Sequence, residues 1–420
     1  MYTRYVRYLL VLWVGLATIG QPQPARAAAQ ITDSHVDYVF GSSIRFIAKI
    51  DSELPIQQAF ISIQSQGEPE TLVKPVVLNK AGEMTYEYDE FEHPFRPFAK
   101  VKYWFDITLE NGDQYTSSRF DFYYEDNRFD WKTPLESEPF RIHWYEGDLP
   151  FAQSILDAAR AGLQHIQTIL PVQAPSGGES GTIDYYIYAN STDMQKALPV
   201  NSQKWVAGHA DPDLNVVEVS LPAGPEQRLW IEQRIPHELM HILLFHSIPN
   251  GYSNIPTWLN EGLASISELT PDPDYQVVLD NAVGKNMLIP LTSLCQSFPV
   301  DQLDQSSAAI AYAESTYFTR YLYRQYGSSG LLALVGSYSN GLDCQRGAET
   351  ALGIPLTALE NQWHTEIAAP VAETKNVSEM LPWFGLLLVV LLVPLMMAFA
   401  GLRTTRKRSP EKTGVYVAEV

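Results

Sequence analysis

The chain carries few charged residues for its length, and basic residues are the scarcer kind. Only 18% of its 420 residues are charged, with 48 acidic against 29 basic side chains and a formal net charge of -19. A surface of this sign repels phosphate backbones, so we expect no nucleic-acid partner. Apolar residues make up 45% and aromatic residues 12%. This composition excludes a largely disordered chain and predicts a large buried core.

The N-terminus has the pattern of a secretory signal peptide. Arg4 and Arg7 precede the apolar run 9–19, and the small-residue site at Ala25 and Ala27 follows it. A positive region, a short apolar region and such a site predict a signal peptide over residues 1–27. An uncleaved N-terminal anchor is the alternative.

A second apolar run lies near the C-terminus. Residues 383–402 are uncharged and, at about 20 residues, long enough for a transmembrane helix. The basic tail 403–420 follows, and the positive-inside rule places it in the cytoplasm. We therefore expect a single-pass protein of the cell membrane, with residues 28–382 extracytoplasmic and 369–382 forming a stalk. A buried helix of a soluble domain is the alternative.

Cysteine is nearly absent. Cys295 and Cys344 both lie in the segment expected outside the membrane, where an oxidising environment favours a disulfide bond. Closing a loop of about 50 residues would stabilise the fold by ~4 kcal/mol in the chain-entropy description. Two buried free thiols are the alternative. Neither cysteine has neighbours suited to metal binding or nucleophilic catalysis.

Residues 28–128 lack any stretch with helical periodicity. About seven short apolar runs with alternating polar residues are separated by turn residues, which predicts an antiparallel β-sandwich of immunoglobulin-like type. Paired carboxylates, metal-ligand clusters and glycine-rich loops are missing here, so we expect a spacer or a substrate-presenting module.

The pattern changes in residues 129–368. Strands are predicted at 140–145, 183–188 and 216–221, with an amphipathic helix at 151–170 between the first two. From residue 227 to about 368 the pattern is mainly helical. The segment therefore predicts one α+β domain.

One motif in this domain carries a specific chemistry. In His237-Glu238-Leu239-Met240-His241 the two histidines stand four residues apart, so on a helix both imidazoles reach the same metal ion. Imidazole nitrogens suit Zn²⁺, and a catalytic zinc uses three protein ligands. Glu238 is placed to act as general base.

The segment 258–264, Trp-Leu-Asn-Glu-Gly-Leu-Ala, supplies a third ligand. Together with the histidine motif it resembles the gluzincin metallopeptidases, and the segment is similar to one in aminopeptidase N-like enzymes. The resemblance implies a zincin-like, thermolysin-like fold with one Zn²⁺ per chain held by His237, His241 and Glu261. Nineteen residues separate His241 from Glu261, against eighteen in that branch. An exposed helical carboxylate is the alternative for Glu261.

A further similarity concerns Tyr312. The segment from Tyr312 to Gly327 resembles a helix of aminopeptidase N-like enzymes that begins with a tyrosine and ends at a glycine. That resemblance implies that the Tyr312 hydroxyl stabilises the oxyanion. Core packing, as for Tyr317 nearby, is the alternative.

The resemblance is incomplete. The G-x-M-E-N segment, whose glutamate holds a substrate's free amine in aminopeptidase N-like enzymes, is missing, and residues 205–210 take its place. We expect His246 either to support a zinc ligand without binding the metal or to be structural. We expect Pro236 to start or kink the zinc helix, and Asn260 or Glu268 to orient a zinc-bound histidine.

These observations predict a membrane-anchored, extracytoplasmic zinc metallopeptidase that acts on a peptide or protein substrate. The alternative is a surface adhesion or scaffold protein with a structural or vestigial zinc site. Glu238 argues for the enzyme, because a structural site needs ligands but no base.

Overall fold

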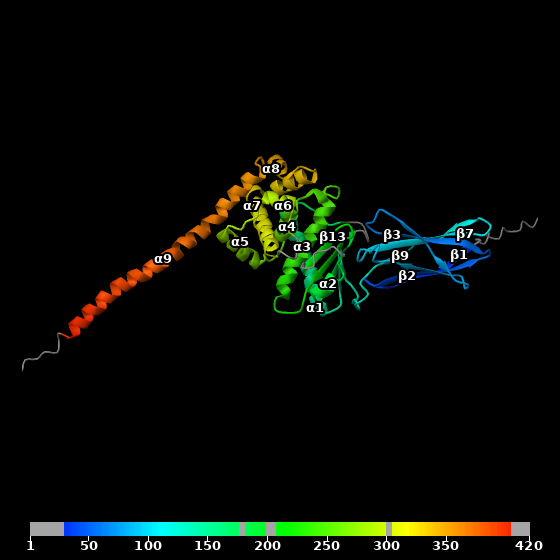
Figure 1. The fold of residues 1–420 in the computed structure, drawn as a ribbon, viewed down its shortest axis with the longest axis horizontal. Helices are drawn as coiled ribbons and strands as arrows, with labels where there is room; N and C mark the ends of the chain where they lie inside the picture. Colours follow the sequence, from blue (N-terminus) through cyan, green and yellow to red (C-terminus); the bar gives the residue numbers. More distant parts are fainter. Residues whose placement is uncertain (1–28, 176–180, 199–206, 300–304, 405–420) are drawn as a thin grey trace, which may run out of the picture. The chain divides into compact units, whose positions relative to one another are not determined.

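The chain divides into two compact units, Met1–Arg128 and Phe129–Val420. A computed structural model describes residues 29–175, 181–198, 207–299 and 305–404 (Figure 1). The predicted signal peptide and nearly all of the predicted cytoplasmic tail lie outside the described residues.

The described part of the first unit consists of strands joined by turns and loops. They are β1 (Ala29–Val39), β2 (Ser43–Ser52), β3 (Ile56–Ser65), β4 (Leu72–Pro75), β5 (Val77–Leu78), β6 (Glu83–Tyr88), β7 (Lys100–Leu109), β8 (Gln114–Thr116) and β9 (Phe120–Tyr123). One antiparallel sheet has the order β1-β2-β6-β5; the other has the order β4-β3-β7-β8, with β9 also paired to β7. A β-rich N-terminal region is therefore confirmed.

Side chains from the two sheets meet in the core of this unit. The rings of Phe46 on β2 and Tyr103 on β7 lie 5.0 Å apart. The apolar run 72–78 is divided between the two sheets, because the chain leaves one sheet at Pro75 and joins the other at Val77. Pro75 has no N–H for a ladder, and the N–H of Val76 bonds the carbonyl of Ala59. The immunoglobulin-like type stays a prediction.

The second unit combines one sheet with many helices. Its elements are β10 (Leu135–Ser137), β11 (Phe140–Trp144), α1 (Leu149–Ile169), β12 (Ile183–Tyr188), α2 (Ser191–Gln195), β13 (Gly208–Asp211), β14 (Val216–Ser220), α3 (Gln227–Ser247), the 3₁₀ turn η2 (Tyr252–Asn254), α4 (Thr257–Ile266), α5 (Pro273–Lys285), α6 (Leu291–Gln296), α7 (Gln305–Ser339), α8 (Cys344–Leu352) and α9 (Leu356–Thr404).

The sheet of this unit has the order β10-β11-β12-β14-β13. Its three central strands are parallel and β10 and β13 pair antiparallel at the two edges. The three central strands and α1 match the sequence-based expectation. The edge strands were not predicted, because three or four residues are too few to show an alternating pattern.

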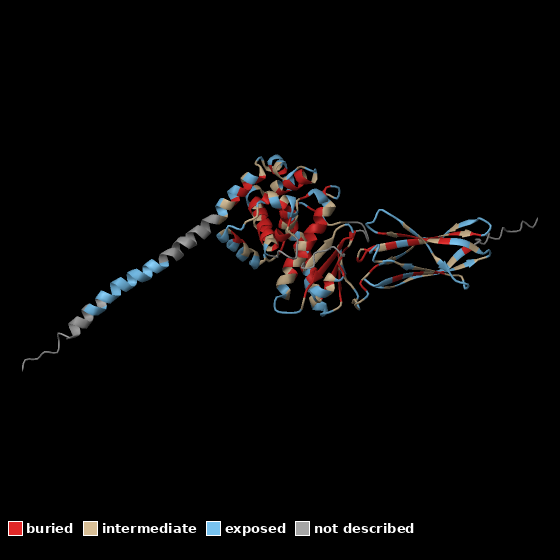
Figure 2. Ribbon diagram, in the orientation of Figure 1, coloured by how far each residue is buried: buried red, intermediate tan, exposed pale blue. Residues whose placement is uncertain are grey.

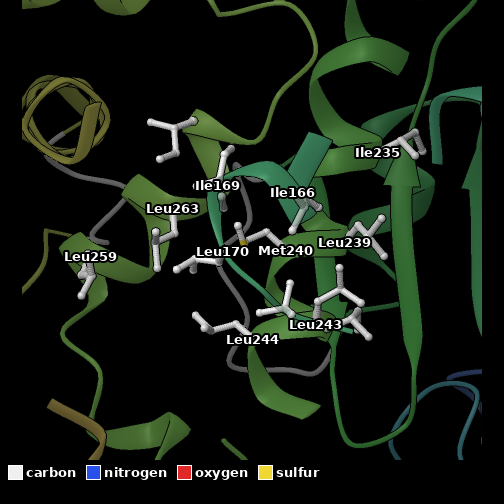
Figure 3. Close-up of a cluster of buried hydrophobic side chains, with 14 of the residues drawn as sticks. Ile166, Ile169, Leu170, Ile235, Leu239, Met240, Leu243, Leu244, Leu259 and Leu263 are labelled. Carbon is white, nitrogen blue, oxygen red and sulfur yellow. The ribbon is translucent and has the colours of Figure 1, made fainter. Parts of the chain in front are cut away.

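Helix α3 lies in the middle of the core. Its residues Leu239, Met240 and Leu243 are at most 1% exposed and pack with side chains from the end of α1 and from α4 (Figure 3). Burying each such side chain contributes roughly 1.5–3 kcal/mol. The helix that carries the histidine motif is therefore held by its apolar faces, which leaves one polar face for the site.

A disulfide bond links Cys295 on α6 to Cys344 on α8, as the sequence predicted. Helix α7 lies between them in the chain and is interrupted at Gly327, whose backbone has φ 64° and ψ -170°. Few residues other than glycine adopt this conformation, so one helix stops here and another begins.

Helix α9 contains the predicted stalk and the predicted membrane span in one continuous helix. Its described apolar side chains between Leu381 and Val393 are exposed (Figure 2). Among the described residues, none of the helices meets the length and hydropathy required of a membrane-spanning segment.

Candidate metal centre

Helix α3 presents His237 and His241 on one face. The residues are one turn apart, and their ring centres lie 5.3 Å from each other. Glu238, the next residue along the helix, lines the same cavity. The helix thus delivers the two imidazoles and the carboxylate together, as the i, i+4 spacing predicted.

Glu261 on α4 reaches the same point. Its Oε2 atom lies 3.5 Å from Nε2 of His237 and 4.0 Å from Nε2 of His241. One ligand atom from each of the three residues lies within 4.8 Å of the others. Ligands about 2.0–2.1 Å from a tetrahedral zinc ion stand roughly 3.4 Å apart, so this donor set fits zinc with little adjustment.

Each histidine is oriented by a second hydrogen bond. Nδ1 of His237 lies 3.1 Å from Oε1 of Glu268, and Nδ1 of His241 lies 3.1 Å from Oδ1 of Asn260. A carboxylate only accepts, so Nδ1 of His237 donates and its Nε2 keeps a lone pair for a metal. Asn260 donates from Nδ2 to the Tyr252 hydroxyl, 3.0 Å away, which fixes its amide. Both sequence candidates for this role are used, one for each histidine.

Pro236 determines where Glu268 sits. It lies inside α3, which begins at Gln227, so Pro236 does not start the helix as one of the two expectations had it. Proline has no N–H, which leaves the carbonyl of Glu232 without its helical donor. The N–H of Leu269 donates to that carbonyl instead, at 2.9 Å. The hydroxyl of Ser267 also donates to the carbonyl of Pro236, at 3.2 Å, so the chain around Glu268 is held against α3.

Glu238 is almost enclosed, with 7% of its surface exposed. Burial raises the pKa of its carboxyl, while the neighbouring His237 and His241 lower it by a smaller amount. A Cβ atom placed on Gly208 of β13 would lie 2.4 Å from Oε1 of Glu238. The edge strand therefore touches the carboxylate through a residue without a side chain, a contact that the sequence did not reveal.

Tyr312 lines the same cavity from α7. Burial raises the pKa of its hydroxyl well above the usual value, with a further increase from Glu261, Tyr275 and Glu238. Its ring also packs edge-on against Phe298, 5.3 Å between centres. The hydroxyl is thus near the carboxylates of the site, and the ring is part of the packing.

A close contact between helices brings Glu261 and Tyr312 to one cavity. A Cβ atom on Gly262 would lie 2.5 Å from the carbonyl oxygen of Ser315 and 2.1 Å from Oγ1 of Thr319. Helices α4 and α7 can approach this closely only because residue 262 is glycine.

His246 stays outside the ligand set. Its ring is half-buried and hydrogen-bonded through Nε2 to Oδ1 of Asn215. This placement agrees with the structural role expected from the five-residue spacing after His241.

The cavity around these residues has a volume of about 680 Å³. It is also lined by residues that sequence reasoning did not select, among them Trp230, Gln233, Arg234 and Tyr275. Arg234, Gln233 and Trp230 stand three, four and seven residues before His237, so they lie on the same face of α3. This helical spacing is the sequence signal by which they could have been identified.

Comparison with known proteins supports a metallopeptidase. Residues 166–369, slightly less than half of the chain, match the family model of the Peptidase MA superfamily. The match supports a zincin-like metallopeptidase family and covers α3, α4 and α7, which carry the site. No curated protein matches the chain.

Solved structures resemble parts of the chain weakly. A carbohydrate-binding module of family 56, a β-1,3-glucan binding domain, is 15% identical with a TM-score of 0.16, covering 21% of this chain and 95% of its own. OgpA from Akkermansia muciniphila, in complex with an O-glycopeptide substrate, is 15% identical with a TM-score of 0.19, covering 26% and 32%. BC0361, a polysaccharide deacetylase from Bacillus cereus, is 8% identical with a TM-score of 0.21, covering 39% and 53%. TM-scores of this size do not establish a common fold.

Proposed function

We propose that the chain is a zinc-dependent peptidase that hydrolyses peptide bonds with Glu238 as general base. The observation that carries this proposal is the convergence of His237 Nε2, His241 Nε2 and Glu261 Oε2 beside the buried carboxylate of Glu238. Two neutral imidazoles and one carboxylate are a donor set used by catalytic zinc. A purely structural zinc site requires only its ligands, so it does not account for the buried carboxylate of Glu238.

Zinc held by these three residues would supply the Lewis acid that polarises the scissile carbonyl and acidifies water. Glu238 accepts a proton from the attacking water and delivers it to the leaving amine nitrogen. Burial raises the pKa of this carboxyl, which makes it a stronger base toward a proton of the attacking water.

We assign Tyr312 as the donor to the developing oxyanion. The hydroxyl keeps its proton because burial and the nearby carboxylates raise its pKa. A neutral donor facing the carbonyl oxygen stabilises negative charge most when that charge has formed, which is in the transition state.

We also propose that the peptidase unit lies outside the cell membrane and is anchored by α9. The disulfide between Cys295 and Cys344 supports an oxidising compartment. The uncharged run 383–402 before a basic tail supports an anchor with a cytoplasmic C-terminus. Carbonate extraction and protease protection of the full chain in its host membranes test this arrangement; release by carbonate would reject the anchor.

The function is tested on the purified full chain by zinc analysis and by mass-spectrometric detection of cleavage in a peptide library, with and without chelator. We expect about one zinc per chain and cleavage that stops when zinc is removed and returns when it is restored. A zinc-loaded protein that cleaves no peptide would reject the peptidase and favour an adhesion or scaffold role.

A further inference from the structure

We propose that Gln233 and Arg234, one turn before His237 on α3, form a subsite that binds a carboxylate-bearing side chain of the substrate. This inference rests on the proposed peptidase function and adds a substrate class to it: peptides with an acidic residue close to the bond that is cut.

Gln233 has a donor without a partner. Its side chain lines the cavity and is 8% exposed, and its amide Nε2 is buried without a hydrogen bond to any described residue. Native proteins leave few buried polar atoms unpaired, because an unpaired group loses its bonds to water and gains none. The Nε2 atom is closed to solvent where it stands, so a turn of the Gln233 side chain toward the cavity that it lines would let it donate to an acceptor of a bound substrate.

Arg234 supplies a charge to the same cavity. Its guanidinium stacks on Trp230, 4.9 Å from the ring centre, and donates to the carbonyl of Ser220. It forms no ion pair with the described residues of the chain. Burial lowers its pKa by more than the attraction of Glu238 and Asp272 raises it. A substrate carboxylate would give this half-buried cation a direct ion-pair partner.

Gln233 and Arg234 lie at a distance from the metal ligands that a bound peptide can span. One helical turn, about 5.4 Å, separates them from His237 along α3. An extended peptide advances about 3.3 Å per residue. A substrate side chain one or two residues from the scissile bond can therefore reach Gln233 and Arg234 while that bond lies at the metal ligands.

The donors favour an anion over a cation at this wall. A guanidinium presents N–H groups in a fork that matches the two oxygens of a carboxylate, and the amide of Gln233 is a further donor. Acidic side chains also line the cavity: Glu238 and Glu261 belong to the proposed metal site, and Glu268 accepts from His237. Asp272 accepts from the N–H of Asp274 and forms no ion pair with Arg234 among the described residues. The wall formed by Gln233 and Arg234 is thus where an acidic side chain finds donors.

The test uses the zinc-loaded full chain in detergent and matched peptides with Glu, Gln or Lys at each of the two positions on either side of the cleaved bond. We expect kcat/KM for Glu to exceed that for Gln by about tenfold or more at one position, the scale of a charge-assisted hydrogen bond. Arg234→Met should abolish this preference, Gln233→Met should reduce it several-fold, and Arg234→Glu should shift it to Lys. Arg228→Met is the control, because Arg228 lies on the same helix but pairs with Glu232 away from this cavity.

A binding experiment separates the subsite from the reaction. The Kd values of the Glu and Gln peptides are measured by fluorescence anisotropy on Glu238→Gln, with and without Arg234→Met. Selective, Arg234-dependent binding without hydrolysis by the wild-type protein would retain the subsite and reject the peptidase. Hydrolysis with equal rates for Glu and Gln, or a preference that survives Arg234→Met, would overturn the subsite and leave the peptidase standing.

Discussion

Gly208 of the edge strand β13 lies directly against the carboxylate of Glu238: a methyl group at position 208 would stand 2.4 Å from Oε1 and 3.0 Å from Cγ. Glu238 is thus confined on one side by backbone. The proposed base owes its position to a residue that contributes no functional group.

Gly208→Ala should therefore displace the base. The carboxylate can swing away, so we expect zinc content and melting temperature to change little while kcat falls by about 10²-fold, the scale of a misplacement of about 1 Å. Kinetics, zinc analysis and thermal melting measure these three quantities. Gly224→Ala is a matched control, because a Cβ atom there would meet nothing within 4 Å. Wild-type kcat in Gly208→Ala would show that this contact does not position the base.

Glu238→Gln should separate chemistry from metal binding. The amide cannot take a proton from water, so we expect activity to fall by about 10²–10⁴ while one zinc remains bound. His241→Ala should lose zinc and activity together. If Glu238→Gln released zinc or kept its turnover, the assignment of base and ligands would be wrong.

The parts of the site that lie within one helix could be predicted from the sequence. Once the segment is helical, the four-residue spacing of His237 and His241 places both imidazoles on one face. Glu261 could be identified as a ligand only through the family resemblance, because its distance from the two histidines depends on how α4 packs against α3. The separate roles of Asn260 and Glu268 could not be distinguished, because the position of Glu268 depends on a backbone hydrogen bond between Leu269 and Glu232, which are far apart in sequence.

In the fold, too, elements with a clear local pattern could be predicted and the others could not. The longer strands and helices were predictable from their periodicity, whereas the four-residue strand β13 was not. The contact between Gly208 on β13 and Glu238 could therefore not be predicted either. Gln233 and Arg234 carried a usable signal, their spacing before His237, but no motif drew attention to them.

Pro236→Ala should weaken zinc binding, although alanine is a better residue than proline for the interior of a helix. Alanine restores an N–H that competes with Leu269 for the carbonyl of Glu232, so the chain around Glu268 should loosen. Loss of such a partner of a metal ligand typically lowers affinity by about 10–100-fold. Competition with a zinc chelator measures this. Pro273→Ala, at the start of α5, removes a proline where a helix tolerates it and should bind zinc as the wild type does. Unchanged affinity in Pro236→Ala would contradict the role given to Leu269.

Tyr312→Phe keeps the ring and removes the hydroxyl. If the hydroxyl stabilises the oxyanion, kcat should fall by about 10²–10³ with little change in KM, zinc content or melting temperature. Tyr317→Phe, five residues along α7, should stay near the wild type. A stable Tyr312→Phe enzyme with normal kcat, or one that loses stability in place of turnover, would return Tyr312 to a packing role.

Glu314 should make stability depend on pH. Burial raises the pKa of its carboxyl to about 8; the N–H of Ile289 lowers it and Glu360 raises it by smaller amounts. Between the ordinary value of 4.5 and about 8 the unfolded chain releases a proton that the folded chain keeps. The free energy of unfolding should therefore fall as pH rises, by up to ~1.4 kcal/mol per pH unit.

Glu314→Gln removes this contribution, so its stability relative to the wild type should increase from pH 5 to pH 8. Urea unfolding at several pH values measures the difference between the two proteins. Glu349→Gln, at an exposed position on α8, is the control and should show no such trend. A difference that stays constant with pH would mean that Glu314 is ionised in the folded protein throughout this range.

The bond between Cys295 and Cys344 makes the intervening chain a covalent ring that contains α7 and Tyr312. A protease that cuts this ring once does not release a fragment, because the two new ends remain joined through the sulfur atoms. The nicked protein would run as one species on a non-reducing gel and as two after reduction. A cut within this ring would therefore leave α7, with the proposed oxyanion donor, attached to the rest of the protein.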